Sequence, residues 1–145
     1  MTMFASESFR TEWQPRVLSV LRIVAALLFL QHGLTKLIGF PGHAPANFHW
    51  LTLAPGLACV IEVVGSLALL FGFYTRLAAF IMSGEMAFAY WMAHVPNGWG
   101  KAGAMGLFPY NNGGEVAILF CFVFLYIAVA GAGAWSLDSR GGAAA

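Results

Sequence analysis

Four long runs of apolar residues dominate the sequence, separated by short segments rich in proline, glycine and polar residues. The runs cover residues 17–40, 53–73, 76–95 and 113–135. Each run is too long for a β-strand and too continuously apolar for an amphipathic surface helix. A helix crosses the hydrocarbon core of a bilayer with about 20 mainly apolar residues. The pattern therefore predicts an all-α, polytopic membrane protein built as a four-transmembrane-helix bundle.

The connections follow from the residues between the runs. Pro41 ends the first run, because proline cannot continue a helix interior. A tight turn at Tyr74 and Thr75 joins the second run to the third, and a glycine-rich loop is expected after Pro96. Four crossings with such short connections leave no room for a separate soluble domain. Residues 1–145 are therefore predicted to form one membrane domain.

Composition narrows the range of functions. Hydrophobic residues make up 60% of the chain and charged residues only 9%, whereas soluble domains average about 45–50% and about 25%. A soluble enzyme of this size needs a charged surface that this chain cannot supply. The net charge of +1 provides no basic surface for a nucleic acid. The expected surroundings are the lipid bilayer, with no nucleic-acid partner.

Basic residues predict the orientation. With a cytoplasmic N-terminus, the inner side holds five arginines and the outer side only two lysines. The inner residues are Arg10, Arg16, Arg22, Arg76 and Arg140, and the outer ones are Lys36 and Lys101. Cytoplasmic loops carry the excess of basic residues in membrane proteins. Both termini are therefore predicted to be cytoplasmic.

Ionisable residues inside the spans carry most of the chemical information. Such residues are costly in a spanning helix, so they face the bundle interior and mark functional positions. Counting the rise of about 1.5 Å per residue sorts them into two layers. The inner layer is Arg22, Glu62 and Glu85, and the outer layer is His32, Lys36, His94 and Glu115.

Each layer has a structural and a functional interpretation. Arg22 could pair with Glu62 or Glu85 as a buried tie that fixes helix register, or the inner layer could handle a ligand or protons. In the outer layer, Lys36 could bind a ligand or extend to the membrane surface. Glu85 and His94 lie on nearly opposite faces of one helix, so both can face one pocket only if that helix bends.

Other chemistry has weaker support. No histidine or cysteine spacing typical of a metal site is present, and no metal is expected. Cys59 and Cys121 are either small buried apolar residues or, at similar depth, a disulfide. No flavin, dinucleotide or nucleophile motif is found. The segment starting at Arg22 is similar to that at Arg76, which indicates either a duplicated two-helix unit or chance.

Taken in order along the chain, the polar motifs resemble the DoxX family of small bacterial membrane proteins. The matching features are Arg22, residues 32–40 (HGLTKLIGF), Glu62, residues 72–76 (GFYTR), residues 93–94 (AH), residues 112–115 (NGGE) and residues 131–138 (GAGAWSLD). The resemblance implies a four-helix fold, a location in the inner membrane and a role as an oxidoreductase. Some DoxD-like relatives are subunits of thiosulfate:quinone oxidoreductases.

Two functions are consistent with these features. The first is a quinone-linked redox subunit working with a soluble partner, in which the outer layer binds the quinone. The four ligand candidates are His32, Lys36, His94 and Glu115, supported by Glu62 and Glu85 as a proton path. The alternative is a non-enzymatic scaffold or a small-solute permease that uses the inner layer of Arg22, Glu62 and Glu85. A permease of four helices would need to form a homo-oligomer.

Overall fold

The computed structural model describes residues 6–46 and 48–140, so the ends of the predicted domain lie outside the described residues. In the described ranges every regular element is a helix, as predicted. The long elements are α1 (Glu7–Ile38), α2 (Ala58–Phe71), α3 (Thr75–Ala89) and α6 (Glu115–Ala130). The shorter elements are η2 (Leu53–Leu57), η3 (Tyr90–His94), α4 (Val95–Ala102), η4 (Gly103–Leu107), α5 (Pro109–Asn112) and α7 (Leu137–Arg140).

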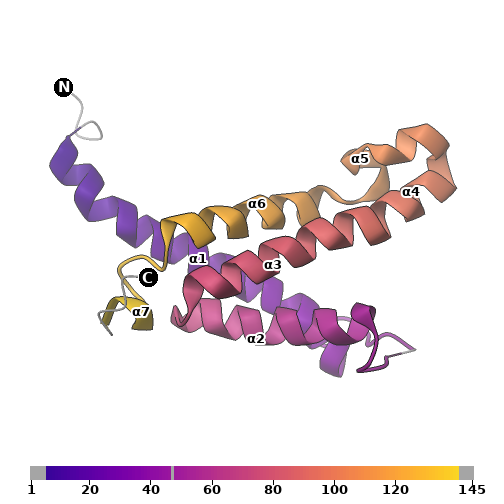
Figure 1. The fold of residues 1–145 in the computed structure, drawn as a ribbon, viewed down its shortest axis with the longest axis horizontal. Helices are drawn as coiled ribbons and strands as arrows, with labels where there is room; N and C mark the ends of the chain where they lie inside the picture. Colours follow the sequence, from indigo (N-terminus) through magenta and orange to yellow (C-terminus); the bar gives the residue numbers. More distant parts are fainter. Residues whose placement is uncertain (1–5, 47, 141–145) are drawn as a thin grey trace.

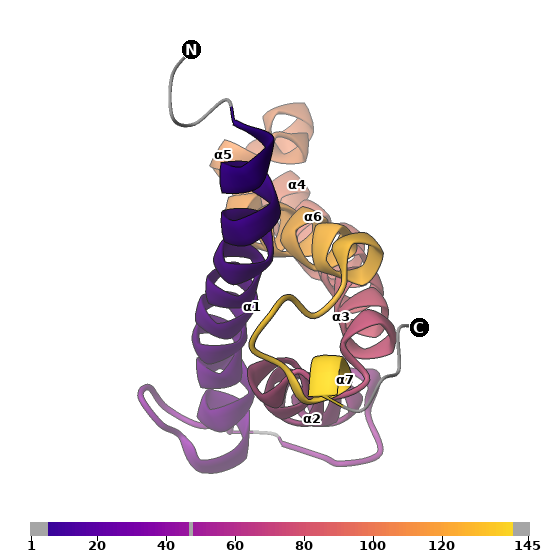
Figure 2. The ribbon, with the colours of Figure 1, turned by 90° about the vertical axis from the view of Figure 1, so that its left-hand side faces the viewer.

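The long helices form two antiparallel pairs. α1 packs along α2, and α3 packs along α6, while α2 also contacts α3. α1 and α6 touch only over a short stretch. The start of α1, the α2–α3 turn and α7 lie at one end of the molecule, and α4 and α5 lie at the other (Figure 1). Seen from the first end, α1 and α3 stand on opposite sides, with α2 and α6 between them (Figure 2).

The observed boundaries differ from the predicted ones at three places. α1 begins at Glu7, ten residues before the predicted start at residue 17, because the Ser6 side chain caps it by accepting a hydrogen bond from the Phe9 amide at 3.2 Å. The third helix does not end near Val95. It continues through the π-helical turn η3 into α4, where Pro96 occupies a first-turn position that tolerates proline. The predicted glycine-rich loop therefore contains α4, η4 and α5.

The C-terminal end of the fourth run was also predicted wrongly. α6 ends at Ala130, and Gly131 has a φ of 97°, a conformation that is readily open only to glycine. The chain does not continue as a helix to Trp135. Instead the segment 131–136 passes α1 and leads to α7 beside α2 (Figure 2).

The exterior of the molecule is apolar and its interior holds charge. Among the described residues, α1 and the helix Leu53–Phe71 are long and apolar enough to cross a membrane, and α6 is a shorter apolar helix. Large apolar side chains such as Val17, Phe80 and Phe122 are more than half exposed. By contrast, Arg22 and Glu62 are buried. This distribution inverts the pattern of a soluble protein and fits a lipid environment.

Gly33 permits the close approach of α1 and α2. A Cβ atom at this position would lie 2.7 Å from Val63 Cγ2 and 3.0 Å from the Val63 backbone nitrogen. A backbone atom cannot move aside as a flexible side chain can, so the two helices would have to separate. Small residues commonly allow such contacts between membrane helices.

We expect Gly33→Ala to lower the free energy of unfolding by about 1–3 kcal/mol, the usual cost of overpacking. Thermal unfolding in detergent, followed by circular dichroism, measures the effect. Gly84→Ala is the matched control, because no atom lies within 4 Å of a Cβ at Gly84 in α3. This control should be neutral or slightly stabilising, and equal effects of the two substitutions would contradict the packing argument.

Candidate functional site

A buried ion pair joins α1 to α2. The Lys36 ammonium donates a hydrogen bond of 2.6 Å to Glu62 Oε1. The Glu62 side chain is only 4% exposed, whereas that of Lys36 is 27% exposed. The pair therefore has one fully enclosed partner and one that still reaches the exterior. The sequence interpretation of Lys36 as a residue that only extends to the surface is wrong.

The local sequence explains how this pair fits between the helices. Gly33 lies about one turn before Lys36, and a Cβ there would lie 3.1 Å from Glu62 Cβ. The missing side chain leaves the space that Glu62 occupies. The Cys59 thiol, one turn before Glu62, donates to the Gly33 carbonyl at 3.5 Å. The buried carboxylate is thus held at the closest approach of α1 and α2.

Three further polar groups lie within electrostatic range of the pair or one helical turn from it. Glu85 on α3 interacts electrostatically with both Glu62 and Lys36, and His32 on α1 interacts with Glu62. Ser66 lies one helical turn after Glu62 and is fully buried. We call the group of His32, Lys36, Glu62, Ser66 and Glu85 the charged site. Elements α1, α2 and α3 all contribute to it.

The charged site contains buried polar atoms without a partner. Glu62 Oε2, Glu85 Oε2 and Ser66 Oγ are enclosed, and none makes a hydrogen bond within the described residues. Leaving such a group unsatisfied typically costs about 1–3 kcal/mol, and more for a charged group. Buried polar groups of this kind need an explanation such as a proton, an ion or a ligand. The site therefore has unused capacity to accept hydrogen bonds.

Of the other two predicted outer-layer residues, one makes a different contact and one is exposed. His94 Nδ1 is 3.2 Å from the carbonyl oxygen of Asn112, and Glu115 is exposed at the start of α6. The helix carrying Glu85 and His94 does change its winding between them, at η3. A role of His94 or Glu115 in ligand binding stays a prediction.

Arg22 does not pair with Glu62 or Glu85, and that expectation from the sequence is wrong. Its guanidinium instead donates to four backbone carbonyl oxygens at the far end of α2 and in the C-terminal segment. The acceptors are Leu69, Leu70 at 3.0 Å, Ala132 at 2.8 Å and Trp135 at 2.5 Å. Carbonyl groups at the C-terminal end of a helix lack intrahelical partners and attract cations. Arg22 is therefore a structural tie.

Asp138 reinforces the same end of the molecule. Its carboxylate accepts hydrogen bonds from the backbone amides of Tyr74 at 3.0 Å and Thr75 at 2.9 Å. These amides begin α3, where negative charge is favourable. Arg22 and Asp138 together fix the C-terminal segment against α2 and α3.

Metal and disulfide chemistry find no support in the described part of the chain. There, no three His, Cys, Asp or Glu side chains are grouped so that they could hold a metal ion. Cys59 and Cys121 are both free thiols, so the disulfide alternative is wrong. Cys59 is buried, and Cys121 lies 3.6 Å from the Ser83 hydroxyl.

Comparison with known proteins shows the family of this chain. The model of the DoxX family matches residues 17–95, a range that includes Arg22, Lys36, Glu62 and Glu85. The chain belongs to the DoxX family. An uncharacterised protein of Haemophilus influenzae is 42% identical over 134 residues, which cover 89% of this chain and 93% of the relative. No solved structure matches the chain.

Membership of the DoxX family and the apolar helices together indicate a membrane protein. In this DoxX chain the charged site can donate from Lys36 and accept at the free oxygens of Glu62 and Glu85. It can therefore bind a neutral polar group and exchange protons with it. Ser66 was missed as a site residue, although its position four residues after Glu62 places both on one helix face.

Proposed function

We propose that this DoxX protein crosses the bacterial inner membrane four times and binds a membrane quinone as a subunit of a redox system. The observation that carries the proposal is the pair of unpartnered carboxylate oxygens, on Glu62 and Glu85, beside the Lys36 ammonium. Intramembrane ionisable residues are costly and mark ion, proton or ligand sites. A quinone suits this site because its carbonyl oxygens accept hydrogen bonds and its reduced form donates them.

The chemistry of the site follows from the partners available. His32 and Lys36 would donate hydrogen bonds to a quinone carbonyl oxygen. Reduction of the quinone to the quinol consumes two electrons and two protons. Glu62 and Glu85 would relay the two protons, each taking up a proton that comes from water and passing it to a ring oxygen, and the electrons would come from the reduced centre of a soluble oxidoreductase partner. The protein would thus bind the ring and exchange its protons.

The four crossings rest on the length of the helices. α1 and Leu53–Phe71 have spanning length by themselves. α3, η3 and α4 follow one another without a break from Thr75 to Ala102, so they form a third helix of sufficient length. α6 is shorter, and α5 adjoins its N-terminal end (Figure 1). Positive charge at the end with α7 supports cytoplasmic termini.

We expect the purified protein to bind a short-chain ubiquinone analogue, measured by quenching of tryptophan fluorescence in detergent. Glu62→Gln and Glu85→Gln should each weaken binding of the corresponding quinol about tenfold, because the hydroxyl groups of the quinol donate hydrogen bonds to these carboxylate oxygens. Glu12→Gln, an exposed acid near the start of α1, is the control and should bind like the wild type. Circular dichroism verifies that each variant is folded.

Two results would contradict this proposal. The wild-type protein could fail to quench with any quinone, or Glu115→Gln could abolish binding while Glu85→Gln leaves it intact. The second result would locate the quinone at the outer layer predicted from sequence.

The grouping of three ionisable residues from three helices also favours one other function, a small-solute permease. Uptake of a cationic solute by proteoliposomes, lost in Glu85→Gln without any quinone binding, would support that alternative.

A further inference from the structure

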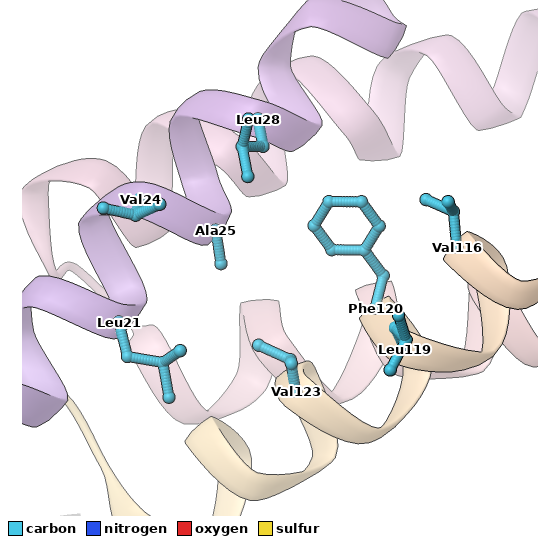
Figure 3. Close-up of a pocket in the computed structure, with 8 residues that line it drawn as sticks. All are labelled: Leu21, Val24, Ala25, Leu28, Val116, Leu119, Phe120 and Val123. Atoms are coloured by element: carbon cyan, nitrogen blue, oxygen red, sulfur yellow. The ribbon is translucent and has the colours of Figure 1, made fainter.

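An apolar groove separates α1 from α6. Its volume is about 250 Å³, and its walls consist of four side chains from each helix. Figure 3 shows Leu21, Val24, Ala25 and Leu28 on the α1 side facing side chains of α6 that include Phe120. No polar side chain lines the groove. It lies where α1 and α6 make few contacts with each other.

The groove leads to the charged site along one face of α1. Leu21, Ala25, Leu28 and His32 follow one another at intervals of four, three and four residues, which places them on one side of a helix. His32 continues this row beyond the groove, and Lys36 lies one further turn along. The apolar lining and the polar ligands are thus parts of one continuous surface.

Phe120 makes the same connection from the α6 side. Its ring lines the groove and also contacts the His32 ring edge-on, with the ring centroids 6.2 Å apart. Phe29 contacts both rings, at 5.1 Å from Phe120 and 5.9 Å from His32. The rings of Phe29 and Phe120 therefore connect the apolar groove to His32 of the charged site.

Charge decides what kind of lipid fits this arrangement. The charged site holds one lysine and two glutamates, which disfavours an anionic phosphate group. Near the opposite end of the groove, Arg22 is fully buried and its guanidinium is occupied by carbonyl oxygens. Neither end therefore offers a free cation to a phospholipid headgroup. The occupant that suits both ends of the groove is a lipid whose head group is uncharged and forms hydrogen bonds.

We infer that the groove between α1 and α6 holds the isoprenoid tail of the quinone and leads its ring to His32 and Lys36. This inference rests on the proposed function, since it requires a quinone ring at the charged site. The groove opens between two helices toward the lipid, so the quinone would reach the site from within the bilayer. Tail length then becomes a determinant of binding.

The test compares long-chain and short-chain ubiquinone on a variant whose groove is filled. Val24→Phe combined with Val116→Phe places two large rings in the groove, and both valines are about half exposed, so folding should be preserved. Val20→Phe combined with Val129→Phe is the matched control. These valines lie on the same two helices and are similarly exposed or more so, but they do not line the groove.

In the filled variant we expect the affinity for long-chain ubiquinone to fall at least tenfold, while short-chain binding and the control variant remain at wild-type values. Unchanged long-chain binding in the filled variant would overturn the inference but leave the proposed function intact. Mass spectrometry of the wild-type protein purified from membranes supplies a second readout. Detection of bound phospholipid in place of bound quinone would also overturn the inference. Absence of binding by either quinone would instead reject the proposed function itself.

Discussion

Arg22→Leu is expected to prevent stable folding of the protein in detergent. The substitution removes the arginine donors that serve the carbonyl oxygens of Leu70, Ala132 and Trp135, whereas the Leu69 carbonyl keeps the Gly72 amide at 3.1 Å. Each buried acceptor without a partner costs about 1–3 kcal/mol. The combined loss should exceed about 3 kcal/mol, a large share of the stability of a small domain. The measurement is the yield of monodisperse protein on gel filtration, with thermal unfolding of any soluble fraction.

Arg76→Leu is the matched control for this prediction. Arg76 also donates to carbonyl oxygens at the end of a neighbouring helix, those of Ala128 at 3.1 Å and Val129 at 2.5 Å. Arg76 is exposed, so water can replace its hydrogen bonds, and we expect a cost of less than about 1 kcal/mol. Normal stability of Arg22→Leu, or equal loss in both variants, would show that burial of Arg22 has no special role.

The contrast between the two arginines shows what the sequence could predict. Hydropathy correctly predicted the helices, because apolar runs of this length have few other solutions. The cost of an ionisable residue in a spanning helix predicted that Arg22 faces the interior, and its side chain is buried. Its partners could not be predicted, because they are backbone carbonyl groups. Every residue has one, so the sequence does not indicate which of them accept from Arg22. The fold of residues 131–136, which supplies two of the acceptors, depends on where α6 ends.

The candidate site was predicted in a similar, partial way. Lys36, Glu62 and Glu85 were all identified as intramembrane groups, but depth along the membrane assigned them to different layers. The structure joins Lys36 to Glu62 because a lysine side chain can reach back along its helix and because Gly33 brings α2 close. Counting residues gives the height of a Cα atom, whereas the charge of a lysine lies several bonds away from it.

The two arginines also bear on the similarity between the two halves of the chain. Arg22 on α1 binds the end of α2, and Arg76 on α3 binds the end of α6. Arg22 lies in the middle of α1 and Arg76 in the first turn of α3, and each contacts the last turn of the second helix of its antiparallel pair. A duplicated two-helix unit stays a prediction beside chance similarity. The two arginines differ in burial, since Arg22 is enclosed together with its acceptors in the C-terminal segment, whereas Arg76 lies close to Gly131 and is exposed.

The second large effect is expected at the buried ion pair. Lys36→Met leaves the Glu62 carboxylate enclosed without its cation, and breaking a buried pair in this way costs about 3–5 kcal/mol. Glu62→Gln should cost less, because the Lys36 side chain is 27% exposed and its ammonium can turn toward the exterior. The two single variants should therefore lose different amounts of stability, with the larger loss in Lys36→Met. Thermal unfolding in detergent measures both.

The double variant Lys36→Met/Glu62→Gln completes the cycle and should be more stable than Lys36→Met alone, because no uncompensated charge remains. The exposed pair of Arg16 and Glu12, with a distance of 2.7 Å and side chains 40% and 57% exposed, provides the control. Arg16→Met should cost less than about 1 kcal/mol, with little coupling to Glu12→Gln. Equal coupling in the two cycles would mean that Glu62 is hydrated in the folded protein. A Glu62 carboxylate that is shielded from water explains why the two single variants differ in stability. It also explains why the second oxygen, Oε2, needs a ligand or a proton.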